Sequence, residues 1–356
     1  MNLVKRTLEA DLKKYFKPGK VTVLYGPRRA GKTTLINQVI TTLGNKAFYL
    51  RGEEKIVNET FSSNESFKMK NLIGDKKYLI IDEAQTIPNI GENLKLFIDS
   101  FPEIAVLASG SSSFDLAKKV GEPLTGRQNV FTLYPFSFSE LLKSWGRVKA
   151  LSMLEEVLVY GSYPETINLT NLEEKRKSLE LLINSYLYRD ILDFEAVKNS
   201  GLIFNLLSLI AYQIGKEVSL TELAGQLQIS KNTVGRYLDL LEKSFVLINI
   251  RGFSRNLRSE VTKNSRYYFW DNGVRNALIS NLNPVSRRGD VGELWENFLV
   301  VERLKKQKYS NQFANNYFWR TYSQQEIDWV EDKDGQLNGY EFKWGKKSGK
   351  IPPSWK

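Results

Sequence analysis

Apolar positions along the chain follow two spacings, one typical of strands and one typical of helices. Three short apolar runs predict buried strands of a parallel sheet, and they cover residues 21–25, 77–83 and 104–108. Helical spacing begins at residues 34–40 and dominates residues 150–215, where leucines recur three and four positions apart. The pattern predicts an α/β domain followed by a helical segment.

The spacing changes again after residue 215. Ser219 and Glu222 form a capping-box pattern that opens a helix through Gln228, and a second helix is expected from Lys231 to Lys243. Strands at 245–250 and 267–270 resemble the two strands of a wing. The last part of the chain adds an amphipathic helix and short strands, at residues 292–300, 319–320, 326–330 and 340–344.

We therefore predict an α/β chain in four parts. These are a parallel sheet with its helices, a helical segment, a pair of helices followed by two wing-like strands, and a partial α/β domain. The predicted boundaries enclose residues 1–145, 146–214, 215–275 and 276–356. At 356 residues the chain is too long for one ordinary core, in agreement with several domains.

Composition narrows the chemistry. The chain has no cysteine and no histidine, so thiolate catalysis, imidazole bases and Cys/His metal sites are excluded. No apolar run approaches the ~18 residues of a membrane span, and no signal-peptide pattern precedes the first strand, so a cytoplasmic protein with no membrane partner is expected. The net charge of +11 suits an anionic partner such as nucleic acid, with solubility as the alternative reason.

A glycine-rich motif lies between the first strand and the first helix. Residues 26–33 satisfy G-x-x-x-x-G-K-[ST] at every fixed position. The glycines let backbone N–H groups surround a phosphate, Lys32 reaches the β- and γ-phosphates, and the Thr33 hydroxyl ligates Mg²⁺. The predicted nucleotide-binding residues are Gly26, Pro27, Arg28, Arg29, Ala30, Gly31, Lys32, Thr33 and Thr34.

Two carboxylates end the second predicted strand. Because ligands bind at the carboxyl ends of strands in open α/β sheets, Asp82 is expected to position Mg²⁺ and Glu83 to activate the attacking water. The third strand ends in a serine-rich stretch from which Ser111 is expected to contact the nucleotide, unless the stretch is only a solvated turn. Arg127 either acts in trans as an arginine finger or fixes its loop locally.

Four motifs in this order resemble one family. They are Gly-Pro-Arg-Arg-Ala-Gly-Lys-Thr-Thr-Leu, Leu-Ile-Ile-Asp-Glu-Ala-Gln, Leu-Thr-Gly-Arg and Leu-Tyr-Pro-Phe-Ser-Phe-Ser-Glu-Leu. Together they resemble the archaeal-type AAA+ ATPases, whose members join an AAA domain to a winged helix and a nuclease-like domain of uncertain role. The resemblance implies a P-loop NTPase (AAA+) sheet for residues 1–145, a helical lid for 146–214, a winged helix for 215–275 and a partial α/β domain like that of restriction nucleases for 276–356. It also implies ATP as the nucleotide and allows a homo-oligomeric ring.

The predicted winged helix carries candidate DNA-binding residues. The second helix is expected to expose its early residues as a recognition helix does, and these are Lys231, Asn232, Thr233, Arg236 and Tyr237. The stretch 251–275 is basic, with two acids (Glu260 and Asp271) against Arg251, Arg255, Arg258, Lys263, Arg266 and Arg275. This predicts a surface that contacts phosphates, although winged helices of ATPases also bind protein partners.

The C-terminal strands carry carboxylates at alternate positions. Glu326, Asp328, Glu341 and Lys343 are expected on one face. An acid followed by acid-x-lysine is the arrangement of restriction-type nucleases, in which Glu296, Asp328 and Glu341 would bind Mg²⁺ and Lys343 would orient water. Ordinary hairpins with charged faces are the alternative. Only 13 residues follow Lys343, so we expect either a truncated sequence or an incomplete domain.

The sequence thus predicts a Mg²⁺-dependent ATPase whose cycle rearranges a lid and a winged helix on DNA. Two alternatives stay open. One is an ATP-gated, metal-dependent DNA nuclease, and the other is a nucleotide-switched regulatory or scaffold protein with a protein partner.

Overall fold

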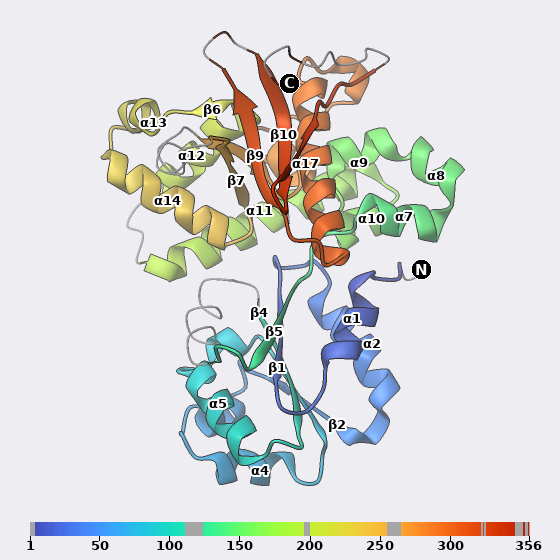
Figure 1. The fold of residues 1–356 in the computed structure, drawn as a ribbon, viewed down its shortest axis with the longest axis vertical. Coiled ribbons are helices and arrows are strands. Elements are labelled where there is room, and N and C mark those ends of the chain that lie inside the picture. Colours follow the sequence, from blue (N-terminus) through green and yellow to red (C-terminus); the bar gives the residue numbers. More distant parts are fainter. Residues whose placement is uncertain are drawn as a thin grey trace. The chain divides into compact units, whose positions relative to one another are not determined.

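The structure of the protein is a computed structural model. It describes residues 4–110, 124–195, 200–254, 265–321, 323, 325–345, 352 and 355, and only the backbone of residues 185–195 and 200. The chain forms two compact units (Figure 1). The first contains residues 4–136 with 243–245, and the second contains the rest.

The first unit is built on a five-stranded, entirely parallel sheet of order β2-β3-β4-β1-β5. Its elements are α1 (Leu8–Tyr15), β1 (Val21–Tyr25), α2 (Lys32–Leu43), β2 (Ala47–Arg51), α3 (Lys55–Phe61), α4 (Ser66–Ile73), β3 (Tyr78–Asp82), α5 (Ile90–Ser100), β4 (Ala105–Gly110) and β5 (Gln128–Thr132). The sequence patterns predicted β1, β3 and β4 and missed the two edge strands.

Burial explains this order. Every residue of β1 and β4 is buried, as expected for central strands covered on both faces by helices. Helices α1 and α2 lie together on one side of the sheet, and α4 and α5 lie on the other (Figure 1). The edge strand β5 is only half-buried, and so it lacks the continuous apolar run of a central strand. The predicted P-loop α/β fold is confirmed.

The second unit joins many helices to a six-stranded sheet of order β11-β10-β9-β7-β8-β6. Its helices are α7 (Phe138–Trp145), α8 (Arg147–Ser152), α9 (Leu154–Tyr160), α10 (Pro164–Asn168), α11 (Leu172–Glu195), α12 (Ser200–Tyr212), α13 (Leu220–Leu227), α14 (Lys231–Lys243), α16 (Asn272–Leu278) and α17 (Val291–Tyr309). Its strands are β6 (Glu217–Val218), β7 (Leu247–Gly252), β8 (Ser265–Phe269), β9 (Asn315–Arg320), β10 (Glu326–Lys333) and β11 (Gln336–Tyr340).

One sheet and one core unite segments that the sequence assigned to separate domains. Strand β7 pairs antiparallel with β8 and parallel with β9, through Arg251–Tyr317 and Gly252–Phe318. A single cluster of buried side chains runs from Val159 to Trp329. The helices of the predicted lid and winged helix and the C-terminal strands therefore pack as one body. Helix α7, predicted with the first domain, lies in this unit as well.

Several local predictions hold in this unit. Helix α14 spans the predicted residues, and the Ser219 side chain accepts from the Glu222 N–H at the start of α13. Strands β10 and β11 form a tight hairpin through Asp334 and Gly335, both with positive φ, as a two-residue type I′ turn requires. The strand predicted at 340–344 is displaced, since β11 ends at Tyr340.

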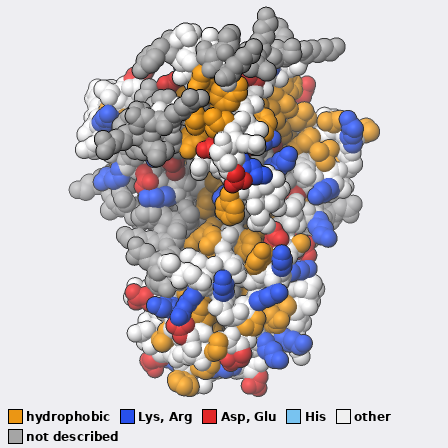
Figure 2. All heavy atoms as spheres, viewed as in Figure 1, with side chains coloured by type: hydrophobic (Ala, Val, Ile, Leu, Met, Phe, Trp, Pro, Cys, Tyr) orange, Lys and Arg blue, Asp and Glu red, His pale blue; other side chains and the backbone are white. Residues whose placement is uncertain are grey.

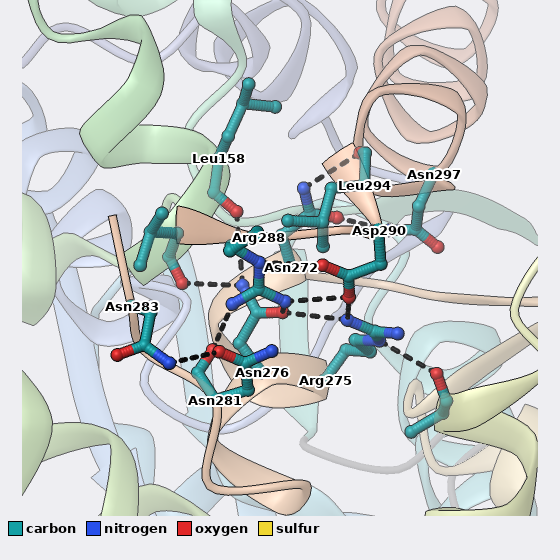
Figure 3. Close-up of polar contacts among 12 residues, drawn as sticks. Leu158, Asn272, Arg275, Asn276, Asn281, Asn283, Arg288, Asp290, Leu294 and Asn297 are labelled. Atoms are coloured by element: carbon teal, nitrogen blue, oxygen red, sulfur yellow. Dashed lines mark hydrogen bonds and ion pairs between the residues drawn. The ribbon is translucent and has the colours of Figure 1, made fainter. Parts of the chain in front are cut away.

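A buried polar network fixes the start of α17. Arg275 and Arg288 both bind the Asp290 carboxylate, and Arg288 also donates to the Asn276 side chain at 2.9 Å (Figure 3). Asn276 in turn donates to the carbonyl of Val159 at 2.8 Å. Because buried charges need partners, this network ties α16, α9 and the residue before α17 into one arrangement. None of the described helices is long and apolar enough to cross a membrane.

Candidate functional site

The glycine loop connects β1 to α2 at the carboxyl edge of the first sheet. Gly31 has a φ of 97° and caps α2, and Arg29 also has a positive φ. A Cβ added at Gly26 would lie 2.3 Å from the carbonyl oxygen of Leu133, so only glycine fits there. Gly26 is therefore required because the backbone of Leu133 approaches it closely, and Gly31 is favoured because of its positive φ.

Lys32 begins α2 and is almost fully buried, with 5% exposure. Its Nζ donates to the carbonyls of Gly26 at 2.9 Å and Pro27 at 3.1 Å, which holds the ammonium group over the loop. Thr33 and Thr34, in the first turn of α2, are exposed. The N-terminus of α2 adds its own positive potential, so lysine, helix and loop together form an anion-binding concavity.

The Asp82 carboxylate lies at the end of β3 and is buried. Its Oδ2 accepts from Thr33 Oγ1 at 2.7 Å and from the Tyr49 hydroxyl at 2.9 Å. Its Oδ1 accepts from the Ser109 hydroxyl and from the Glu83 N–H. Because β4 lies between β1 and β3, Ser109 at the end of β4 fills the space between the loop strand and Asp82.

Glu83 follows in a left-handed conformation, with φ 53°. Its carboxylate accepts a hydrogen bond from the Gln85 side chain at 2.5 Å. This bond orients the carboxylate at the carboxyl edge of the sheet, beside Asp82. Arg127 forms an ion pair with Asp99 of α5, the arrangement expected if it fixes its loop locally. Ser111 lies outside the described residues.

Neither Tyr49 nor Ser109 was predicted as a partner of Asp82. Tyr49 belongs to β2, a strand that the apolar pattern did not reveal. The parallel register pairs Arg51 of β2 with Asp82 of β3, and it is this non-local pairing that brings Tyr49 to the carboxylate.

The structure describes some of the predicted DNA-binding residues and not others. Lys231, Asn232 and Arg236 are exposed at the start of α14, and Thr233 is half-buried. Tyr237, predicted to be exposed, is 6% exposed and packs in the core. Arg255 and Arg258 lie outside the described residues.

Two arginines of the predicted basic surface do not lie on it. Arg266 and Arg275 are 3% and 2% exposed, and both are ion-paired inside the second unit. Buried guanidinium groups that already have carboxylate partners cannot contact phosphates. The prediction that these two arginines contribute to a phosphate-binding surface is therefore wrong.

The C-terminal carboxylates gather around a pocket of the second unit. The pocket has a volume of about 760 Å³ and is lined by Glu296, Glu326, Asp328 and Lys343 among others. Lys343 Nζ lies 2.9 Å from a Glu341 oxygen and 3.8 Å from Asp328 Oδ2. In the described part of the chain, no three acidic side chains are placed to share a metal ion.

Burial and like charges shift the pKa values of this cluster. Burial, reinforced by Asp328, raises the pKa of Glu296 to about 8. Burial also raises the pKa of Asp328, against the Phe342 N–H and Lys343. Although burial opposes it, the pKa of Lys343 is raised by Glu341 and Asp328. Carboxylates that raise each other's pKa need a positive partner.

Comparison with known proteins agrees with this division of the chain. Residues 18–142 match the family model of an AAA domain. Residues 151–285 and 291–351 match models described as domains of unknown function (DUF8612 and DUF4143). Apart from residues 243–245, the middle and C-terminal matches both lie within the second compact unit.

Relatives span nearly the whole chain. An uncharacterized protein of Mycobacterium tuberculosis is 26% identical over 96% of this chain and 74% of its own length. An uncharacterized protein of Methanocaldococcus jannaschii is 24% identical over 91% of this chain and 75% of its own. A solved structure of a RuvB variant from Thermotoga maritima is 18% identical over 69% of this chain and 88% of that chain, with a TM-score of 0.34.

The parallel sheet and the glycine loop define a P-loop nucleotide-binding fold. The AAA-domain match makes this more specific: the N-terminal domain of the chain belongs to the AAA+ ATPase family. This family and the parallel sheet support nucleotide binding and hydrolysis.

Proposed function

We propose that this protein is a Mg²⁺-dependent ATPase whose nucleotide site comprises Lys32, Thr33, Asp82 and Glu83. The observation that carries the proposal is the hydrogen bond of 2.7 Å between the Thr33 hydroxyl and Asp82. It brings the two protein oxygens expected for Mg²⁺ together beside a loop built for phosphates. Hydroxyl and carboxylate oxygens are the donors that Mg²⁺ prefers, so the residues fit the metal.

Each residue has a defined part in the proposed reaction. Backbone N–H groups of residues 26–33 and the Lys32 ammonium bind the β- and γ-phosphates, and residues 28, 29 and 34 flank them. Mg²⁺, if bound with ATP, would neutralise charge on the phosphates. Thr33 and Asp82 would hold the metal in place. Glu83, oriented by Gln85, accepts a proton from the attacking water.

Nucleotide binding tests the loop. Lys32→Ala is expected to abolish binding of a fluorescent ATP analogue in Mg²⁺, because charge-assisted phosphate contacts dominate such sites. Lys20→Ala is the matched control, since Lys20 is exposed and precedes the opposite end of β1, and it should bind as the wild type does. Equal affinity of the wild type and Lys32→Ala would refute the assignment.

We further propose that the ATPase cycle acts on DNA. The support is the net charge of +11 and the exposure of Lys231, Asn232 and Arg236 in the first turns of α14. These turns precede an antiparallel pair, β7 and β8, as in a winged helix. The first unit shows no such basic surface on the face drawn in Figure 2, where Lys and Arg side chains are mixed with Asp and Glu side chains.

The salt dependence of DNA binding tests this proposal. Lys231→Ala/Arg236→Ala should weaken binding and reduce the slope of log affinity against log salt by about 2, since each phosphate contact contributes about 0.9. Lys68→Ala/Arg147→Ala removes the same charge from exposed positions elsewhere and should leave the slope unchanged. Equal slopes for wild type and the α14 variant would favour the alternative, in which the α13–α14 region binds a protein partner.

A further inference from the structure

Two arginines, Arg266 and Arg320, line the carboxylate pocket of the second unit, and only Arg266 is buried. Arg266 lies on β8, two strands away from β9 and three from β10 in the sheet order. Its guanidinium passes 4.4 Å above the Phe318 ring of β9 and reaches Glu326 of β10, with Nη2 2.9 Å from Oε2. Only 4% of its side chain is exposed. The arginine therefore spans the face of the sheet beneath the pocket.

The same guanidinium also faces the helix-borne carboxylate. Arg266 Nη1 lies 3.9 Å from Glu296 Oε1, and this oxygen accepts from the Tyr268 hydroxyl at 2.7 Å. Arg266 and Tyr268 occupy alternate positions of β8 and so share one face of the strand. Strand β8 thus supplies both a charge and a hydrogen bond to Glu296.

Two more of the predicted metal ligands, Asp328 and Glu341, have protein partners too. Asp328 accepts from the Phe342 N–H at 2.8 Å, and Glu341 pairs with Lys343 at 2.9 Å. A restriction-type metal site would instead require carboxylates that converge on one ion. The described carboxylates do not converge in this way. Glu296 faces Arg266 and Tyr268, whereas Asp328 and Glu341 contact the Phe342 N–H and Lys343.

We propose that Arg266 is the built-in counter-ion of this pocket and takes the place of a divalent metal ion. The residues therefore do not fit the metal centre that the nuclease resemblance implies. A guanidinium is always charged and satisfies carboxylates through several fixed donors. A dication a few ångströms from it would meet strong repulsion in a buried setting. The pocket is then a salt-bridged structural centre that binds no Mg²⁺ and does not cut DNA.

Titration with Mn²⁺, a Mg²⁺ substitute, tests this proposal in the nucleotide-free full chain, with free Mn²⁺ read by electron paramagnetic resonance. The wild type and Asp328→Asn should give the same binding curve. Arg266→Met should gain one site, at least about tenfold tighter than any binding of the wild type in this pocket. That site should disappear in Arg266→Met/Asp328→Asn. The result does not depend on the ATPase proposal, because no nucleotide is present.

A second arginine provides a matched control. Arg303 of α17 binds Glu331 of β10 at 2.8 and 2.6 Å and lies 4.0 Å above the Tyr340 ring, so Arg303→Met removes a similar ion pair away from the pocket. It should gain no Mn²⁺ site. Circular dichroism verifies folding, and if Arg266→Met does not fold, Arg266→Gln keeps an amide donor for Glu326.

Two outcomes would overturn the proposal. One is a wild-type Mn²⁺ site that Asp328→Asn removes. The other is a folded Arg266 variant that gains no site.

Discussion

Replacing Tyr49 by phenylalanine removes one hydrogen bond from the Asp82 carboxylate and leaves the ring in place. Tyr49 and Thr33 are the two side chains that donate to Asp82 Oδ2, at 2.9 and 2.7 Å. Burial and the nearby Asp82 raise the pKa of the Tyr49 hydroxyl, so it stays a donor at neutral pH. A hydrogen bond to a charged group contributes about 1.5–3 kcal/mol, and half-exposure of Tyr49 favours the lower value.

We therefore expect Tyr49→Phe to raise the Mg²⁺ concentration for half-maximal ATP turnover about tenfold, since partners of metal-binding carboxylates change metal affinity by about 10–100-fold. The assay is steady-state ATP hydrolysis over a Mg²⁺ series at saturating ATP. Tyr78→Phe is the matched control, because Tyr78 lies at the opposite end of the neighbouring strand β3. An unchanged Mg²⁺ requirement in Tyr49→Phe would refute the idea that this hydroxyl orients Asp82 for the metal.

Two further substitutions test the fold around the sites. Gly26→Ala places a Cβ 2.3 Å from the Leu133 carbonyl oxygen. It should therefore lower the free energy of unfolding by about 1–3 kcal/mol and weaken ATP binding. Gly225→Ala is the control, because a Cβ there has nothing within 4 Å, and it should not lower the melting temperature. Asp290→Asn should lower the free energy of unfolding, measured in urea at pH 7, by about 3 kcal/mol, because it leaves two buried arginines without their carboxylate. Although burial opposes it, hydrogen bonds from these arginines lower the pKa of Asp290. Its stabilisation is therefore present above the unfolded-state pKa and lost as pH falls through the folded-state pKa, so the variant and the wild type should converge below about pH 4. A cost that is independent of pH would contradict this assignment.

The side chains of the proposed nucleotide site could largely be selected from the sequence, because most of them lie in local motifs. The loop is contiguous, and Asp82 and Glu83 end an apolar strand whose position in a parallel sheet follows from its burial pattern. Tyr49 and Ser109 joined the site through sheet order and register, which depend on pairings between distant segments. No local pattern encodes those pairings.

Charge and periodicity explain the errors in the second unit. A count of basic residues cannot tell an arginine that faces solvent from one that crosses a sheet to a carboxylate, and so Arg266 was misplaced. The error at Tyr237 was avoidable. This residue follows Val234 by three positions and precedes Leu241 by four, which places it on the apolar face of α14. The parallel pairing of β7 with β9, which merges the predicted domains, had no local signal.

We propose that Glu83 activates water in an ATP site formed by the glycine loop and Asp82. The most direct test measures ATP binding and Mg²⁺-dependent phosphate release of Glu83→Gln beside the wild type. We predict that the variant binds ATP with unchanged affinity and releases phosphate about 10²–10⁴-fold more slowly. Phosphate release by Glu83→Gln at the wild-type rate would contradict this role of Glu83.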